Sequence, residues 1–300
     1  MRFSATEAAF EGFRLVRRDP KVLLFWGLLY LLVTVGQLVM MYLHREQIAV
    51  GVAAIEALST RPMNTPEDMT AWLEAYNQTT AYGIWLLPLS LIIGAVMSAG
   101  IARAVLFPEE KSRFGYLRLG ADEVRVLIVS ICIGLLAGII MAAAFFVLAV
   151  LIAGAALMPP LWLAVFVAFL GVIALFVWLA VKWSLAIPIT MTRKKLAIFD
   201  SFAATKGRFW PLLGMAIVAG VMGILIWLLS MIVVMPLSLL SGAGAMGGAT
   251  SEMMRQLAAA NPLLLLTAVA NAIVYALMVG IVYAPFSAAW RDIKALTPSD

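Results

Sequence analysis

Long apolar runs separated by short polar segments dominate this chain. Several runs reach the length of about 20 residues that a helix needs to cross the hydrocarbon of a bilayer. They lie near residues 20–43, 81–107, 124–151, 160–190, 209–236 and 262–290. Because backbone groups in lipid must pair within their own segment, each run is expected to be helical. The pattern predicts a single all-α integral membrane domain over residues 1–300, with six transmembrane helices.

An amphipathic pattern precedes the first run, in the opening stretch "AAFEGFRLVRRDP". Ser4 and Glu7 have the spacing of a capping box, and acidic residues come before basic ones, as the helix dipole favours. The stretch predicts one amphipathic helix of about 15 residues that lies along the membrane interface. Its aromatic residues, Phe10 and Phe13, are expected to pack against the rest of the protein.

Similar short motifs precede the third and fifth runs. The paired apolar residues of the opening helix recur as Phe114 with Leu117 and as Phe199 with Phe202. The sequence therefore predicts three repeats, each an interfacial amphipathic helix followed by two spans. Their boundaries are 1–107, 108–192 and 193–300.

The second run of each repeat extends beyond the length that a span requires. In the first two repeats Arg103 and Lys182 mark where the membrane surface is expected, yet apolar sequence continues after both. Prolines that are expected to bend or end the helices fall in the extensions: Pro108, Pro188 and Pro285. We expect the extensions to pack against the interfacial helices and to form a collar on the cytoplasmic side.

Small residues inside the runs are expected to let the helices approach one another closely. They are Gly94, Ala95, Ser98, Gly134, Gly138, Gly154, Gly171 and Gly220. These residues predict a compact bundle and carry no information about activity.

The longest polar segment, about 44–80, follows the first run. Within it "TPEDMTAWLEAY" predicts a short helix, with Thr65 as its cap and Pro66 at the first helical position. Apolar residues fall on one face of this helix: Met69, Trp72, Leu73 and Tyr76. This face is expected to pack on the bundle as a lid, and the alternative is a partner-binding surface. In the segment that precedes the sixth apolar run, Ser251 is predicted to cap one or two helical turns.

The distribution of charge predicts an orientation. The chain is 64% apolar and 12% charged, against about 45–50% and about 25% in soluble domains. Of its 21 lysine and arginine residues, all but Arg45, Arg61 and Arg255 lie on the same side as the N-terminus. Since cytoplasmic loops retain basic residues, the pattern predicts a bacterial inner (plasma) membrane protein with both termini in the cytoplasm. The net charge of +5 lies between apolar runs, so no nucleic acid is expected as a partner.

The chain carries little of the chemistry that catalysis requires. No acidic residue falls inside a run, and no paired carboxylates, catalytic motif or phosphate-binding loop occurs. His44 and Cys132 are its only histidine and cysteine, so neither a metal site nor a cofactor is expected. The sequence therefore predicts a protein that is not an enzyme.

Basic residues beside the membrane are the candidate contacts for lipid headgroups or a protein partner, because each adds about 1 kcal/mol of attraction to an anionic surface. They are Arg14, Arg17, Arg18, Lys111, Arg113, Arg118, Lys182, Arg193, Lys194, Lys195, Lys206 and Arg208. Lys182 is expected to extend to the interface, with a substrate contact as the alternative. Gln37 and Asn271 lie inside runs and are expected to hydrogen-bond between helices, with the lining of a polar cavity as the alternative.

The stretch "AIFDSFAATKGRFWPLLG" resembles a group of bacterial six-span integral membrane proteins, including the membrane domain found beside some glycerophosphodiester phosphodiesterases. The residues that match this group are Phe202, Lys206, Gly207, Arg208, Phe209 and Trp210. A second stretch, "GIARAVLFPEEKSRFGYLRLGADE", resembles inner-membrane proteins of alphaproteobacteria that are mostly of unknown function. The resemblance implies the six-span architecture. The catalytic domain of the phosphodiesterases has no counterpart here, so no enzymatic activity is carried over.

These observations favour a non-enzymatic multi-pass membrane protein that acts as a scaffold or accessory subunit. Its basic cytoplasmic face is expected to hold anionic lipid of the inner leaflet, or a protein partner such as a second copy of the chain. The alternative function is a transporter or channel for a lipid or small amphiphile. That alternative predicts a continuous path that reaches Gln37, Asn271 or Lys182.

Overall fold

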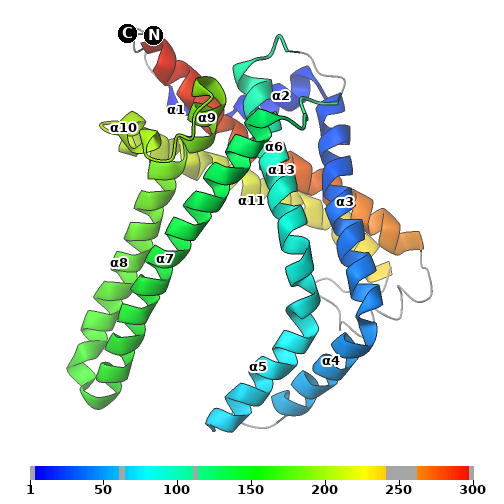
Figure 1. Cartoon of the computed structure of the whole chain (residues 1–300), viewed down its shortest axis with the longest axis vertical. Coiled ribbons are helices and arrows are strands. Elements are labelled where there is room, and N and C mark those ends of the chain that lie inside the picture. The colour runs from blue at the N-terminus through cyan, green and yellow to red at the C-terminus, as the bar shows by residue number, and fades with distance from the viewer. Residues whose placement is uncertain (1–3, 61–64, 111–113, 241–261, 297–300) are drawn as a thin grey trace. The chain divides into compact units, whose positions relative to one another are not determined.

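The computed structural model describes residues 4–60, 65–110, 114–240 and 262–296 (Figure 1). Every regular element in these ranges is an α-helix or a short 3₁₀ helix, as the apolar runs predict. The chain divides into two compact units. Unit 1 comprises Met1–Arg18, Gly94–Val221 and Gly280–Asp300, and unit 2 comprises Asp19–Ile93 and Met222–Val279.

In the described ranges, 6 helices are long and apolar enough to cross a membrane. They are α3 (Lys21–Leu43), α6 (Leu87–Leu106), α7 (Ala121–Leu157), α8 (Trp162–Trp183), α11 (Phe209–Leu240) and α13 (Pro262–Leu296). Each matches one predicted span, so the prediction of an all-α multi-pass membrane protein is confirmed. A 3₁₀ helix, η1 (Ala81–Leu86), leads into α6. No more than 39% of the most apolar window of any of these spans is buried, so lipid must cover the remaining apolar side chains.

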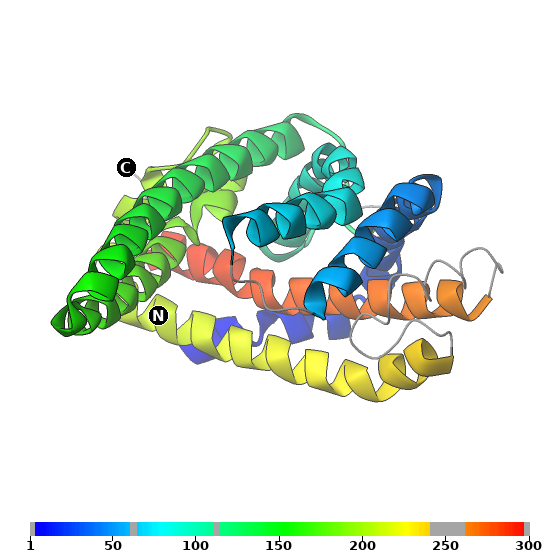
Figure 2. The same ribbon diagram turned by 90° about the horizontal axis from the view of Figure 1, so that it is seen from below.

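In unit 1, α7 and α8 form an antiparallel pair, and Figures 1 and 2 both show them side by side. The 3₁₀ helix η2 (Pro159–Leu161) connects them. Near this connection Leu148 and Val165 belong to a small buried cluster. Close to the start of α7, Val126 packs in a second cluster with Ala102 of α6. Protein contacts therefore fix α7 near both of its ends, and the apolar side chains exposed along it are left to lipid.

The fourth predicted span is interrupted near its end. α8 stops at Trp183, and α9 (Ala186–Arg193) begins after two intervening residues. Pro188 in α9 lacks the N–H that would bond to the carbonyl of Ser184 four residues earlier, which weakens the helix at the break between α8 and α9. The predicted effect of Pro188 is thus confirmed. Pro108 likewise follows the end of α6, whereas Pro285 lies inside α13 without ending it.

Unit 2 contains a helical hairpin that the sequence predicts only in part (Figure 2). α5 (Pro66–Thr80) begins with the predicted cap, in which the side chains of Thr65 and Asp68 each accept a hydrogen bond from the other residue's backbone N–H. Its partner α4 (Arg45–Ser59) forms in a stretch where sequence analysis places only a polar segment. The two helices approach closely at Gly51, where an added Cβ would lie 2.8 Å from the carbonyl oxygen of Ala75.

The predicted apolar face of α5 does not pack on the protein. Met69, Leu73 and Tyr76 are each about half exposed, whereas Ala75 is buried against α4. The lid interpretation is therefore wrong for this face. A small residue makes the contact because a short side chain allows two helices to approach more closely than a long one does.

The opening segment forms two helices in place of the one predicted. α1 (Ala5–Ala9) begins at Ser4, whose hydroxyl accepts a hydrogen bond from the backbone N–H of Glu7. α2 (Glu11–Arg18) follows after a break at Phe10. The third copy of the motif forms only the short helix α10 (Asp200–Ala204). Helices do therefore precede the first and fifth spans, but they are shorter than predicted.

The middle copy of the motif is not a helix. Residues 107–120, where described, form turns and irregular structure. Gly115 and Tyr116 have positive φ angles of 59° and 65°, which lie outside the right-handed helical region. The interfacial helix of the middle repeat is therefore a wrong prediction. The division of the chain into three repeats stays a prediction.

Most of the glycines singled out from the sequence do not bring helices together. The exceptions among the small residues are Gly154, where an added Cβ would lie 3.5 Å from the side chain of Leu161, and Ala95, which is buried in the cluster with Ala102 and Val126. Among the described residues, nothing lies within 4 Å of an added Cβ at Gly94, Gly134, Gly138, Gly171 or Gly220. In unit 2 the close approach is instead at Gly27, where an added Cβ would lie 3.3 Å from the side chain of Ile273. Beside it Tyr30 and Tyr275 make an edge-to-face contact, with ring centroids 4.6 Å apart.

Candidate functional site

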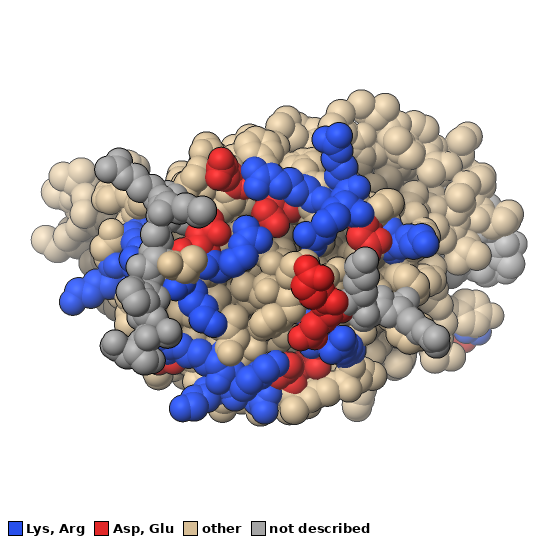
Figure 3. Space-filling view, turned by 90° about the horizontal axis from the view of Figure 1, so that it is seen from above, with Lys and Arg blue, Asp and Glu red and all other residues tan. Residues whose placement is uncertain are grey.

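The charged residues of unit 1 gather around one group of segments, which we call the collar. It comprises α1, α2, the described residues of the segment 107–120, the stretch 186–210 with α9 and α10, and the part of α13 from Pro285 onward. Figure 3 shows basic and acidic side chains interspersed on the face of the molecule that carries these segments. The spans α6, α8 and α13 all enter the collar at the ends where sequence analysis predicts extensions.

The first helices of the chain contact α13 through their small residues. An added Cβ on Gly12 would lie 2.4 Å from the Cα of Ile281, so no larger residue fits at this position without a shift of backbone. Glu11 is 6% exposed and accepts hydrogen bonds from Arg14 and Arg291, both at 3.4 Å. Glu11 is thus buried against the protein, whereas its partner Arg14 stays exposed.

The end of α2 contacts α6. A guanidinium nitrogen of Arg18 donates a hydrogen bond of 3.0 Å to the carbonyl oxygen of Ala104, near the end of that helix. Both α6 and α13 thus contact the opening segment, as predicted for the extensions of the spans.

A buried ion pair joins α6, the loop 107–120 and α7. Arg103 donates to the carboxylate of Glu123 at 2.5 Å and to the carbonyl oxygen of Tyr116 at 2.7 Å. The two charged side chains are 3% and 5% exposed. The sequence pattern does not predict this pair, since 20 residues separate its members and neither the helical period nor a motif links them.

α9 and the residue after it bond to three neighbouring elements, α13, α7 and α10. Its Thr192 hydroxyl accepts a hydrogen bond of 2.8 Å from the indole N–H of Trp290 in α13. Lys194, at its C-terminal end, forms an ion pair with Asp122 at the start of α7. Arg193 pairs with Asp200 of α10 at 3.0 Å. These bonds confirm that the extended ends of the spans pack together in a collar.

The aromatic residues of the motif face mostly away from the protein. Phe10, Phe13 and Phe199 are 41%, 37% and 68% exposed. Their predicted packing role is therefore wrong, because small side chains such as Gly12 occupy the face toward α13. Phe202 is the exception: its ring contacts Trp178 and Trp183, with centroids 5.8 and 5.9 Å apart.

Within the described ranges, the predicted basic contacts differ in the partners that they have. Arg14, Arg118, Arg193 and Lys194 form ion pairs with acidic residues of unit 1, and Arg18 bonds to a carbonyl. Lys182 is half-buried, with its ammonium 5.9 and 6.0 Å from the ring centroids of Trp178 and Phe202. By contrast, Arg17, Lys195, Lys206 and Arg208 form no ion pair with a described residue. Lys111 and Arg113 lie outside the described residues, as does Ser251.

Three of these bases lie in one segment with exposed apolar side chains. Leu196, Phe199 and Trp210 are 51%, 68% and 77% exposed. Lys195, Lys206 and Arg208 lie between and beside them in sequence. We call these six residues the 195–210 anchor. Basic and aromatic residues mixed in this way are typical of a membrane–water interface.

The two polar residues predicted inside the spans belong to unit 2 and are not part of the collar. Asn271 donates a hydrogen bond of 3.0 Å to the carbonyl of Thr267 in its own helix, so the predicted bond between helices is wrong for this residue. Gln37 is exposed on α3.

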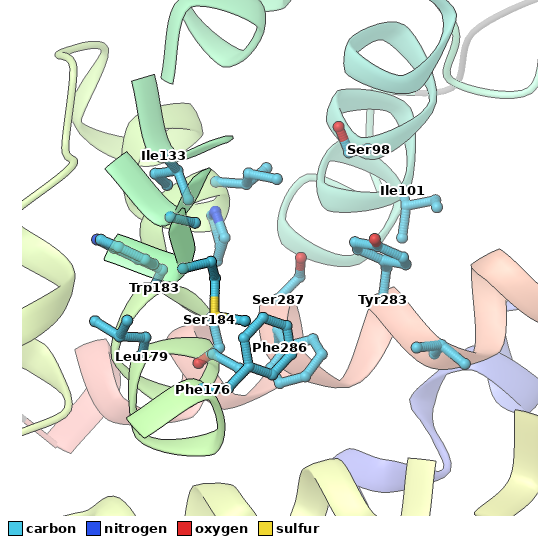
Figure 4. A pocket seen from close by; sticks show the side chains of 16 residues that line it. Ser98, Ile101, Ile133, Phe176, Leu179, Trp183, Ser184, Tyr283, Phe286 and Ser287 are labelled. Atoms are coloured by element: carbon cyan, nitrogen blue, oxygen red, sulfur yellow. The ribbon is translucent and has the colours of Figure 1, made fainter. Parts of the chain in front are cut away.

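An apolar cavity of about 380 Å³ lies next to the collar, within unit 1. Its 16 lining residues come from α6, α7, α8, α9, α13 and Ser184 (Figure 4). Hydroxyl groups reach it from four of them: Ser98, Ser184, Tyr283 and Ser287. The hydroxyls of Ser98 and Ser184 donate to carbonyls of their own helical turns, at 2.7 and 2.8 Å. The lining does not include Gln37, Asn271 or Lys182.

In the described part of the chain, no group of three or more histidine, cysteine, aspartate or glutamate side chains is placed to hold a metal ion. Comparison of the chain with protein-family models, curated proteins and solved structures found no match. No family is therefore identified for this chain. Within its described residues it has six candidate membrane-spanning helices, the pattern of a multi-pass membrane protein.

Proposed function

We propose that this chain is a non-enzymatic protein of a bacterial inner membrane that holds anionic lipid at its collar. The observation that carries the proposal is the 195–210 anchor, in which three bases without an acidic partner among the described residues adjoin three exposed apolar side chains. An anionic phospholipid satisfies both, because its phosphate attracts the bases while its acyl chains cover the apolar groups.

The ion pairs elsewhere in the collar support the assignment of the anchor bases, and not the other bases, as the lipid contacts. Bases such as Arg118 and Arg193 already have carboxylate partners, which compete with a phosphate for them. Lys195, Lys206 and Arg208 have none in the described part of the chain, so a lipid phosphate can bind them without breaking an existing pair.

In this proposal the collar faces the cytoplasm, and both termini are inside. The excess of lysine and arginine on that side favours this orientation. The anionic leaflet of a bacterial inner membrane would then lie beside the anchor. A scaffold or accessory role follows from this placement, because the lipid would fix the exposed segments of the collar at the membrane surface.

Two other functions remain as alternatives. A protein partner, or a second copy of the chain, is the alternative occupant of the same face, and the experiment below separates it from lipid. A transporter of amphiphiles has less support, since the cavity of unit 1 does not extend to Gln37, Asn271 or Lys182.

The test is extraction in mild detergent followed by analysis of the lipid and protein that stay bound. We expect anionic phospholipid to be retained in preference to zwitterionic lipid. The triple variant K195Q/K206Q/R208Q is expected to lose about 100-fold in affinity for phosphatidylglycerol in nanodiscs, at about 1 kcal/mol for each charge removed.

The matched control is K195R/K206R/R208K, which keeps the charge at each position and is expected to retain the lipid. Purified protein that carries neither anionic lipid nor a partner would contradict the proposal. Retention of a second protein chain in place of lipid would favour the alternative occupant.

A further inference from the structure

We propose that the cavity of unit 1 binds the alkyl chain of one single-chain amphiphile, with Ser287 as the hydrogen-bonding partner of its polar end. This site is separate from the 195–210 anchor and shares no residue with it. The two proposals can therefore fail independently of each other.

The lining of the cavity fits an alkyl chain. Aliphatic and aromatic side chains form most of it, among them Ile133, Met141, Phe176 and Leu179. In Figure 4 Ile133, Leu179 and Trp183 lie on one side of the cavity, and Ser98, Ile101 and Tyr283 lie on the other. The volume of about 380 Å³ is near the lower end of the range of about 300–1,000 Å³ for ligand pockets. One chain suits this space better than the two chains of a phospholipid.

Ser287 gives the cavity a polar end. The residue is 3% exposed, and its hydroxyl has no hydrogen-bond partner among the described residues. A serine hydroxyl in a membrane helix ordinarily bonds back to its own helix, as Ser98 and Ser184 do here. The Ser287 hydroxyl lines the cavity with its hydrogen-bonding capacity unused, so a polar group of a ligand would be bound there favourably. A second unpartnered polar atom of the described residues, the buried Nε1 of Trp183, belongs to the same lining.

The direction of the ligand follows from the positions of these residues along their helices. Ser287 lies in the collar, four residues before Arg291. On α8, Phe176 lies six residues, or about 9 Å of helix, before Lys182. The polar end of the amphiphile therefore lies at the collar, and its chain extends toward the apolar part of the spans. The surrounding membrane is the natural source of such a molecule.

The test uses the full chain in mild detergent with palmitic acid that carries a diazirine in the middle of its chain. After irradiation, peptide mass spectrometry is expected to locate the label on α7 and α8 around Ala137 and Phe176. We expect saturable labelling that unlabelled palmitic acid displaces and butyric acid does not. Equally effective displacement by diacyl phosphatidylglycerol would overturn the choice of a single-chain ligand. Labelling that does not saturate would overturn the site itself.

Two substitutions on one helix provide a matched pair. Ala137 lines the cavity, whereas Ala142 is exposed on α7 and does not line it. A137F fills the space and is expected to lower the affinity for palmitic acid by at least about tenfold, while A142F leaves it unchanged. Equal labelling of the two variants would contradict the proposal.

A third variant covers the case in which A137F does not fold. S287A preserves the apolar lining and is expected to weaken palmitic acid binding by about three- to tenfold, with the label on the same peptides. Unchanged affinity in S287A would contradict the role of this hydroxyl.

Discussion

The basic residues of this chain have different roles that depend on how deeply each is buried. Arg103 and Glu123 are almost fully buried and bond to each other, and Arg103 also bonds to a loop carbonyl. Arg118 and Glu110 form a pair of similar chemistry, but both side chains are about half exposed. Removal of water strengthens the attraction within the first pair and raises the penalty for leaving either member alone.

This difference predicts unequal losses of stability when one acid is removed. E123A leaves the buried Arg103 unpaired and is expected to lower the free energy of unfolding by about 3–5 kcal/mol. E110A is the matched control, with an expected loss of about 0–1 kcal/mol. Thermal unfolding of the two variants in the same detergent, followed by circular dichroism, measures the difference. Equal melting temperatures would mean that the buried pair does not stabilise the junction of α6 with α7.

At the scale of elements, the helices of the collar present small residues to the protein and aromatic residues to their surroundings. Gly12 lies against α13, whereas Phe10 and Phe13 are exposed. An interfacial helix stabilises its exposed apolar side chains by placing them among lipid acyl chains. Periodicity predicts which residues share a face, but it does not state which face turns toward protein when lipid is the competing environment.

The two phenylalanines near α10 allow this distinction to be tested. F202S removes a ring that packs on Trp178 and Trp183 and is expected to cost about 2 kcal/mol of stability. F199S alters a ring that is 68% exposed and is expected to leave the melting temperature in detergent unchanged.

The measurement is the melting temperature of each variant alongside the unsubstituted protein. F199S is expected to act instead on membrane anchoring, seen as weaker retention of lipid. A larger thermal loss in F199S than in F202S would show that the packing has been assigned to the wrong ring.

At the scale of the whole molecule, the six long apolar helices of the described residues and a strong charge asymmetry are typical of a protein in a bilayer. Charge asymmetry follows from the cost of moving lysine and arginine across the membrane, and it predicts orientation without any knowledge of packing. The proposed lipid contacts depend on this orientation, because they require the collar to meet an anionic leaflet.

Topology reporters test the orientation directly. A reporter inserted at residue 60 is expected to be outside, whereas reporters at residues 115, 200 and 300 are expected to be inside. Cysteine accessibility at the same positions in intact cells provides an independent measurement. A signal from the cytoplasm at residue 60 would reverse the orientation and place the collar outside the cell.

The sequence by itself determined that lipid surrounds much of this protein and where its spans lie. Backbone groups in lipid must hydrogen-bond within their own segment, so a long apolar run has to form a helix. The sequence also determined the cap of α5 at Thr65 and the break at Pro188, since both act over one helical turn. Local chemistry of this kind needs no partner from a distant part of the chain.

Only the tertiary structure decided which residues meet. The pairing of Arg103 with Glu123, the contact of Gly12 with Ile281 and the cavity beside Ser287 all join segments with no shared periodicity or motif. Each depends on how far two backbones can approach, and the side chains on both of them set that distance. The one-dimensional pattern therefore gives the spans and the charged ends, and close packing selects the buried pair and the cavity.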